Sequence, residues 1–215
     1  INDTDSSASD MFTLNLTDTA VLGNDDGIYI YDDDTDVLVT INLVGNTTVT
    51  GTNGDGIDTS DSDTDYTIIN MDGDSGGSPA VLGAVNGIDI SGQGDPDEDP
   101  EIHVNDGSVT GNTGDGISVD SDAIITVGDG DLLLATVSGG ASGGGVGDHG
   151  IDGNFWNDIT VNSDGTVTGW DDGINVDVDN DIAVIGGVVT GTNGNGIVGT
   201  DDNEIDISAG AVVTG

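Results

Sequence analysis

Three short sequence marks recur in a fixed order along the chain, and this repeat constrains the fold more than any other feature. The first mark is an apolar-x-apolar pair, found at Leu14/Leu16, Ile41/Leu43, Ile69/Met71, Ile102/Val104, Ile125/Val127, Ile159/Val161, Ile182/Val184 and Ile205/Ile207. The second is Val-x-Gly, found at Val21–Gly23, Val49–Gly51, Val81–Gly83, Val109–Gly111, Val137–Gly139, Val167–Gly169, Val189–Gly191 and Val213–Gly215. The third is Gly-Ile, found at Gly27-Ile28, Gly56-Ile57, Gly87-Ile88, Gly116-Ile117, Gly150-Ile151, Gly173-Ile174 and Gly196-Ile197. Self-similarity of this kind is typical of solenoids, in which each repeat stacks on its neighbours.

The spacing between the marks is regular. Successive Val-x-Gly marks lie 22 to 32 residues apart, measured from Val to Val. The second apolar residue of a pair precedes the next Val by 5 or 6 residues in six repeats and by 10 in two. The longer repeats add their residues at the same three places, so these places are predicted to be corners.

This pattern predicts an all-β fold: a parallel β-helix of about eight rungs of 22–32 residues, with three short strands per rung. Alternating apolar and polar residues favour strands with one buried face. Rungs that pair in parallel lie about 4.8 Å apart, so eight rungs give a rod of roughly 40 Å with Ile, Val and Leu inside. Connections between parallel strands favour a right-handed coil. We expect glycines at the corners to supply positive φ angles, and the preceding Asp or Asn to tolerate left-handed conformations.

Charge restricts the partners of the chain. It has 42 acidic residues and no Lys or Arg, so its formal net charge is −42. Nucleic acid is excluded as a partner, because no basic side chain other than two histidines can neutralise phosphate. Anionic membrane surfaces are disfavoured for the same reason. The chain has no cysteine, which excludes disulfides and thiolate metal sites.

The repeat resembles a known class of proteins. Segments such as Val109-Thr-Gly-Asn-Thr-Gly-Asp-Gly-Ile117 are similar to the passenger repeats of bacterial autotransporters and other large extracellular adhesins with a right-handed β-helix. The resemblance covers nearly the whole chain and implies an extracellular or cell-surface location. It does not extend to the calcium-binding nonapeptide repeat of RTX proteins, because no run of Gly-Gly-x-Gly-x-Asp is present.

One predicted corner is consistently acidic, between each Gly-Ile mark and the next apolar pair. Stacked carboxylates about 5 Å apart repel one another, and hard cations such as Ca²⁺ bind clustered carboxylates. Two interpretations of this corner stay open: Ca²⁺ bound between rungs, or a solvated acidic surface without a bound cation. The candidate metal ligands are Asp32, Asp34, Asp36, Asp61, Asp63, Asp65, Asp95, Asp97, Asp177, Asp179 and Asp181.

Polar residues at outward strand positions are predicted to form rows along the rod. One row holds Asn15, Asn42 and Asn70, and the Val-x-Gly mark carries mostly Thr at its middle position. Such rows stabilise parallel stacks through hydrogen bonds between rungs.

The tryptophans and histidines allow several interpretations. Trp156 and Trp170 either pack over the insertion at Ser138–Gly150 or form a platform on which sugars stack. His103 occupies an outward strand position and His149 lies in the insertion, so we expect no shared metal site or catalytic pair.

Residues 1–215 are predicted to form a single β-helix domain that continues beyond both ends, within a longer chain or between subunits stacked head to tail. Ile1 lies 13 residues before Leu14, as Ile28 lies 13 before Ile41, so Ile1 is expected to take the Gly-Ile position. Unpaired strand edges favour further pairing, so the chain itself is an expected partner through head-to-tail or lateral association.

The function predicted is an extracellular structural or adhesive rod: a filament, sheath or surface stalk, with bound Ca²⁺ as a possible stabiliser. Two alternatives are a glycan-binding module and a polysaccharide-acting enzyme of the pectate lyase or polygalacturonase type, for which paired carboxylates are plentiful. We predict that the chain is not an enzyme, because it lacks Lys and Arg to stabilise developing negative charge.

Overall fold

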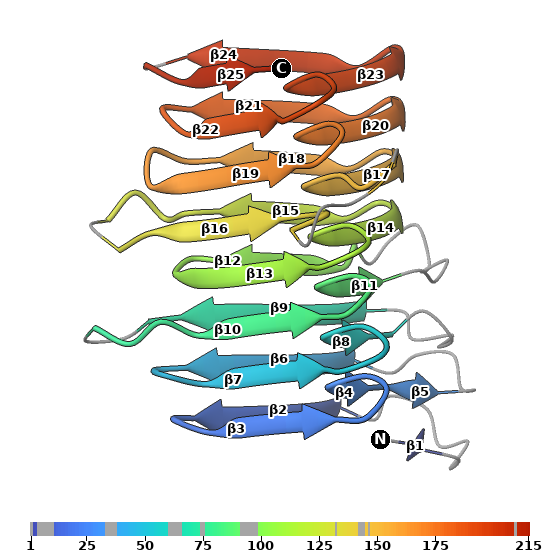
Figure 1. Ribbon diagram of the computed structural model, residues 1–215, viewed down its shortest axis with the longest axis vertical. Coiled ribbons are helices and arrows are strands. Elements are labelled where there is room, and N and C mark those ends of the chain that lie inside the picture. The colour runs from blue at the N-terminus through green and yellow to red at the C-terminus, as the bar shows by residue number, and fades with distance from the viewer. Residues whose placement is uncertain are drawn as a thin grey trace.

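The computed structural model describes residues 2–3, 11–32, 38–59, 66–73, 76–90, 99–131, 133–141, 145, 147–208 and 210–215. These residues form strands and turns, and none of them is helical. The chain climbs as a right-handed coil, with the front strands running left to right and the back strands right to left (Figure 1). The predicted parallel β-helix is therefore confirmed. Across the described residues, no helix is long and apolar enough to cross a membrane.

Three parallel sheets form the sides of the rod. Sheet I contains the Gly-Ile marks in β4 (Ile28–Tyr29), β8 (Ile57–Asp58), β11 (Ile88–Ile90), β14 (Ile117–Ser121), β17 (Ile151–Phe155), β20 (Ile174–Val178) and β23 (Ile197–Asp201). Sheet II contains the apolar pairs in β2 (Met11–Thr17), β6 (Leu38–Val44), β9 (Tyr66–Asp72), β12 (Glu101–Val104), β15 (Ile124–Val127), β18 (Asp158–Val161), β21 (Asp181–Ile185) and β24 (Glu204–Ser208). Sheet III contains the Val-x-Gly marks in β3 (Ala20–Gly23), β7 (Thr48–Gly51), β10 (Ala80–Gly83), β13 (Gly107–Gly111), β16 (Ala135–Ser138), β19 (Gly165–Gly169), β22 (Val188–Gly191) and β25 (Val212–Thr214).

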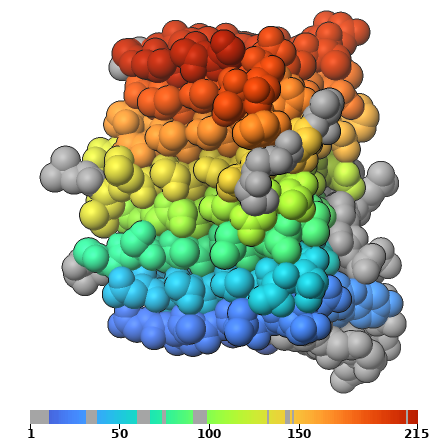
Figure 2. All heavy atoms as spheres, in the orientation of Figure 1, coloured from blue at the N-terminus to red at the C-terminus, as the bar shows by residue number. Residues whose placement is uncertain are grey.

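The register of these sheets follows the sequence marks residue for residue. Ile88 lies beside Ile57 and Ile117, Ile102 lies beside Ile69 and Ile125, and the Val residues of sheet III are aligned in the same way. Figure 2 shows the resulting rungs as layers packed on one another in sequence order. Because a strand alternates its faces every residue, this register turns the marked aliphatic side chains toward the core. They are buried in the inner rungs, whereas Ile205 and Ile207 of the last rung are exposed.

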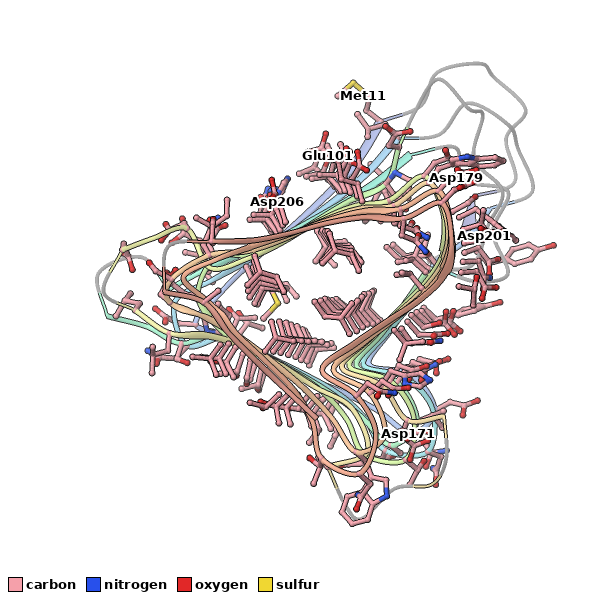
Figure 3. The ribbon with its side chains drawn as sticks, turned by 90° about the horizontal axis from the view of Figure 1, so that it is seen from above. Met11, Glu101, Asp171, Asp179, Asp201 and Asp206 are labelled. Atoms are coloured by element: carbon pink, nitrogen blue, oxygen red, sulfur yellow. The ribbon has the colours of Figure 1, made fainter. Side chains whose placement is uncertain are left out.

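The core is a set of aliphatic columns parallel to the rod. Ile57, Ile88, Ile117, Ile151 and Ile174 have no exposed surface. Figure 3, which looks along the rod, shows such columns superposed within a three-sided outline while acidic side chains point outward. Burying each of these side chains contributes about 2 kcal/mol, so the columns supply most of the stabilisation that a chain poor in aromatics needs.

The outward asparagine row is confirmed. Asn42 Nδ2 donates to Asn15 Oδ1 at 2.8 Å, and Asn70 Nδ2 donates to Asn42 Oδ1 at 2.9 Å. A threonine contact also joins neighbouring rungs, with Thr190 Oγ1 at 3.2 Å from Thr214 Oγ1.

Positive φ angles occur, as expected, at glycines of the corner between sheets II and III, namely Gly45, Gly128 and Gly186. Between sheets I and II, positive φ occurs at Asp122, Trp156, Asp179 and Asp202 in four successive rungs. Neither the Gly-Ile glycines nor the residues before them have positive φ among the described residues. The expectation is therefore confirmed at the corner between sheets II and III and wrong for the Gly-Ile glycines.

Close packing explains these glycines instead. A Cβ on Gly56 would lie 2.5 Å from the carbonyl oxygen of Gly87 and 2.5 Å from Cγ1 of Val81. Contacts this short leave no room for a side chain, so the corner requires glycine because neighbouring rungs approach one another closely.

Ile1, which was expected to take the Gly-Ile position, lies outside the described residues. The described residues next to it form strand β1 (Asn2–Asp3), which pairs with β5 (Tyr31–Asp32) and places Asn2 beside Tyr31.

Candidate functional site

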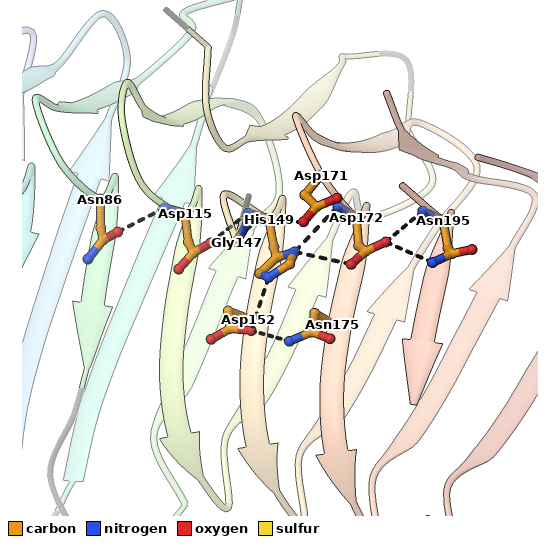
Figure 4. Close-up of polar contacts among 9 residues, drawn as sticks. All are labelled: Asn86, Asp115, Gly147, His149, Asp152, Asp171, Asp172, Asn175 and Asn195. Atoms are coloured by element: carbon orange, nitrogen blue, oxygen red, sulfur yellow. Dashed lines mark hydrogen bonds and ion pairs between the residues drawn. The ribbon is translucent and has the colours of Figure 1, made fainter. Parts of the chain in front are cut away.

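A continuous polar ladder runs along one corner of the rod. We call it the pre-glycine ladder, because each member directly precedes a Gly-Ile mark. Its members are Asp26, Asp55, Asn86, Asp115, His149, Asp172 and Asn195. The side chain of each member except Asn195, the last, accepts a hydrogen bond from the backbone N–H of the ladder residue in the next rung. Figure 4 shows the part of the ladder from Asn86 to Asn195.

The geometry of this ladder is uniform where the acceptor is an oxygen. The backbone N–H of Asn86 lies 2.6 Å from Asp55 Oδ1, and that of Asp115 lies 2.8 Å from Asn86 Oδ1. At His149 the acceptor is Nδ1, and the N–H of Asp172 reaches it at 3.4 Å. Asp, Asn and neutral His share one property, a short side chain with an acceptor, which explains why these residue types occur here.

A second row lies beside the ladder on the outer face of sheet I. We call it the sheet I outer row, and its members are Tyr29, Asp58, Asp89, Ser118, Asp152, Asn175 and Val198. Asn86 Nδ2 donates to Asp89 Oδ2 at 3.2 Å, which ties the two rows together. Together the rows form an acidic strip along the rod.

Burial of carboxylates without a basic partner raises their pKa values in this strip. Burial raises the pKa of Asp89 to about 7, and the neighbouring carboxylates of Asp55 and Asp58 add to the rise. Oδ1 of Asp89 is buried and has no hydrogen-bond partner among the described residues. Burial likewise raises the pKa of Asp115 to about 7, although the N–H bond from His149 opposes the shift. A buried Asp of this strip that has no cation beside it therefore favours its neutral, protonated form.

Two groups of carboxylates come close enough to hold a hard cation. Asp26, Asp55 and Asp58 offer oxygens within 4.8 Å of one another, at the first rungs of the strip. The neighbouring pocket is lined by Asp25, Asp26, Tyr29 and Asp58. This oxygen-only ligand set suits Ca²⁺ better than a transition metal.

The second group lies at the corner between sheets II and III. Asp129, Asp131 and Asp164 offer oxygens within 4.8 Å of one another. Asp164 also accepts hydrogen bonds from the N–H groups of Gly130, at 2.9 Å, and Asp129, at 3.3 Å. These acids thus hold the turn together as well as gathering negative charge.

Few of the predicted metal ligands can be placed. Asp34, Asp36, Asp61, Asp63, Asp65, Asp95 and Asp97 lie outside the described residues, and for Asp32 only the backbone, in β5, is described. Asp177 lies in β20, Asp179 occupies a positive-φ turn position, and Asp181 begins β21 beside Asp158 and Glu204. These last three belong to neither of the two close groups.

Sequence reasoning missed a buried asparagine ladder at the corner between sheets I and II. Asn157 and Asn180 have no exposed surface. Asn157 Oδ1 accepts the N–H of Ala123 at 3.0 Å, and Asn180 Oδ1 accepts the N–H of Asn157 at 2.9 Å. Asn203 continues the ladder by accepting the N–H of Asn180 at 2.9 Å. The signal was present, since in three rungs an Asn lies two residues before the apolar pair.

The histidines and tryptophans lie at separate places. His103 Nε2 lies 2.9 Å from Glu101 Oε2 on the outer face of sheet II, whereas His149 is part of the pre-glycine ladder. The backbone N–H of Trp170 donates to Gly139 at 3.1 Å, and its side chain lies against Gly140, which supports packing over the insertion. Trp156 lies at another corner and is 59% exposed.

Taken together, these observations describe a stacked acidic rod with two candidate cation groups. In comparisons with known proteins, no family model, curated protein or solved structure matches the chain.

Proposed function

We propose that this chain is a structural rod of an extracellular or cell-surface protein, acting as a stalk, filament or sheath component. The observation that supports this is the pre-glycine ladder, which joins seven successive rungs through side-chain acceptors. Because each repeat contacts only its neighbours, repeats can be added without a limit on length. The fold is therefore suited to a long, stiff rod.

We further propose that bound hard cations, Ca²⁺ above all, stabilise the folded rod. The chain has 42 acidic residues and no Lys or Arg, so screening must come from outside. The group of Asp26, Asp55 and Asp58 is the best-formed oxygen site for this role. A cation that binds only the folded rod stabilises it by mass action.

Thermal melts followed by circular dichroism test the cation part of the proposal. Melts are recorded with Ca²⁺ and with EDTA at the same ionic strength. Chelation is expected to lower the melting temperature, and Asp58→Asn should remove most of the difference. The matched control is Asp206→Asn, because Asp206 is exposed and belongs to neither close group. Coincident melts with and without Ca²⁺ would eliminate the cation role.

The rod itself is tested by replacement in the host protein. Replacing residues 1–215 with a Gly/Ser linker of equal length should shorten the distance from the cell surface to a distal tag. The proposal of a surface stalk would be contradicted if the tag lay equally far from the cell surface with the flexible linker. It would also be contradicted if the tag could not be labelled on intact cells.

A further inference from the structure

An exposed aromatic pair interrupts the acidic corner between sheets I and II. Phe155 ends β17 and Trp156 follows it, and their ring centroids lie 5.9 Å apart with the planes tilted by 46°. Phe155 is 42% exposed and Trp156 is 59% exposed. Aromatic residues make up only 3% of the chain, so an adjacent, solvent-facing pair is a distinct surface.

The turn itself does not require Trp156. Its φ is 55°, and the equivalent residues of three other rungs are Asp122 at 57°, Asp179 at 59° and Asp202 at 50°. The hydrogen bonding is also shared, because Trp156 N–H donates to Val178 just as Asp122 N–H donates to Phe155. Asp tolerates the left-handed region, whereas a bulky residue is strained there. The exposed indole recovers little of that cost by burial, and such an outlier points to function.

Carboxylates surround the pair. Asp122 and Asp179 occupy the same turn position in the rungs before and after Trp156. Asp158 lies two residues further on and is stacked against Asp181. Burial and the neighbouring Asp181 raise the pKa of Asp158, which shows how closely these like charges are crowded. The same causes act on Asp99, whose pKa is raised by burial and by the charges of Asp122, Asp158 and Glu101.

This combination selects a cationic partner. The face of an indole ring carries negative electrostatic potential and attracts ammonium and guanidinium groups, and Trp does so best of the aromatic residues. The surrounding carboxylates add attraction for cations and repel anionic ligands. No Lys or Arg exists in the chain to satisfy this surface from within.

We propose that Phe155, Trp156 and the flanking acids Asp122 and Asp179 form a docking surface for a basic polypeptide segment. An Arg or Lys side chain of the partner stacks on Trp156, while further basic residues pair with the acids. In the described rungs from Asp122 to Asp202, carboxylates recur at this corner with a spacing of about 5 Å between rungs, so a chain with several cations fits better than a single small cation.

The test uses the Trp170→Phe background, in which Trp156 is the only tryptophan and its fluorescence reports binding directly. The probe is a synthetic peptide of alternating Arg and Ser, titrated at physiological salt. Trp156→Asn leaves the charge unchanged, and Trp156→Asp adds a carboxylate in a turn where three rungs already carry Asp. Because these variants lack the indole, their affinities are measured by peptide fluorescence anisotropy, alongside the parent protein.

Both variants are expected to weaken peptide binding by about tenfold, the size of a cation–π contact with a partly desolvated ring. Phe155→Leu keeps Trp156 and its turn, so this variant should weaken peptide binding less. Circular dichroism melts check that the rungs remain folded. If Trp156→Asp binds the peptide as tightly as the parent or more tightly, the attraction is bulk charge alone and the proposal fails. It also fails if a neutral oligosaccharide quenches Trp156 and competes with the peptide, because the surface would then be a glycan platform.

Discussion

At the scale of single residues, buried amides and carboxyls have opposite effects on this rod. The side chain of Asn180 is satisfied on all sides: Oδ1 accepts the N–H of Asn157, and Nδ2 donates to Asn203 Oδ1 and to the carbonyl of Val178. Asp115 instead holds a charge that burial disfavours. Hydrogen-bonded buried amides stabilise a fold, whereas buried carboxylates without a cation make its stability depend on pH.

Replacing Asn180 with Ala should destabilise the chain by about 3 kcal/mol, because the substitution leaves the buried N–H of Asn157 without an acceptor. Urea unfolding followed by circular dichroism measures the change. Asn193→Ala is the matched control: its side chain is exposed and makes one bond, to the carbonyl of Trp170. Equal losses in the two variants would show that the buried ladder has no special role.

The stability of the rod should fall as pH rises from 5 to 8. An acid whose folded pKa lies near 7, above the ordinary 3.8, binds its proton more tightly in the folded state. The resulting stability is complete below the ordinary pKa and is lost as pH rises through about 7. Asp115→Asn should flatten this dependence and raise the melting temperature at pH 8. Asn already occupies the ladder at positions 86 and 195, so the substitution fits the site.

These melts are recorded in EDTA at fixed ionic strength, so that bound cations do not contribute. Asp206→Asn removes the same formal charge from an exposed position and controls for net charge. A pH slope that is identical in the Asp115→Asn variant and the parent would rule out Asp115 as its source.

At the scale of strands and corners, the sequence predicted which residues pair but not how the corners close. Aliphatic side chains such as Ile88 and Ile102 have one role, burial, and their two-residue alternation fixes the register. Polar corner residues have several roles that use the same residue types. Asp115 is an acceptor for the next rung, whereas Asp122 is a positive-φ turn residue, and no local pattern distinguishes the two.

The candidate cation groups were hard to predict for the same reason. Asp26, Asp55 and Asp58 come together because two rungs and two rows meet there, which depends on the exact corner path. The sequence placed the acids of the neighbouring corner together instead. Three of those, Asp177, Asp179 and Asp181, occupy a strand, a turn and a strand start, and they belong to neither close group.

Replacing Gly87 with Ala should destabilise the rod by about 2 kcal/mol, which is typical of overpacking. The added Cβ would lie 2.5 Å from the carbonyl oxygen of Gly116 and 2.6 Å from Cγ1 of Val109. Gly145→Ala is the control, because a Cβ there meets nothing within 4 Å. Chemical denaturation of both variants measures the difference. A neutral Gly87→Ala would mean that rungs do not approach as closely as described.

At the scale of the whole molecule, a net charge of −42 on 215 residues acts against compactness. The Debye length falls from about 10 Å at 0.1 M salt to about 3 Å at 1 M, so added salt screens repulsion between rungs progressively. Folding confines carboxylates that the unfolded chain keeps farther apart, so screening favours the folded state.

The melting temperature should therefore rise steadily with NaCl between 0.05 and 1 M, even in EDTA. Differential scanning calorimetry measures this, with a neutral osmolyte series as the control for general solvent effects. A melting temperature that does not change with NaCl would show that repulsion between the carboxylates is already neutralised in another way.

The two polar ladders run together from the rung of Ala123 to that of Asn203, and there they give each rung two unlike faces. In the pre-glycine ladder, the later rung donates the N–H and the earlier rung supplies the side-chain acceptor. In the asparagine ladder the order is reversed, because the earlier rung donates to the later one. Toward the next rung, such a rung presents the side-chain acceptor of the pre-glycine ladder and the N–H donor of the asparagine ladder. Toward the previous rung, it presents the N–H donor of the pre-glycine ladder and the side-chain acceptor of the asparagine ladder. In an inverted rung, acceptors would face acceptors and donors would face donors. The rod is therefore polar, and every added rung must have the same orientation.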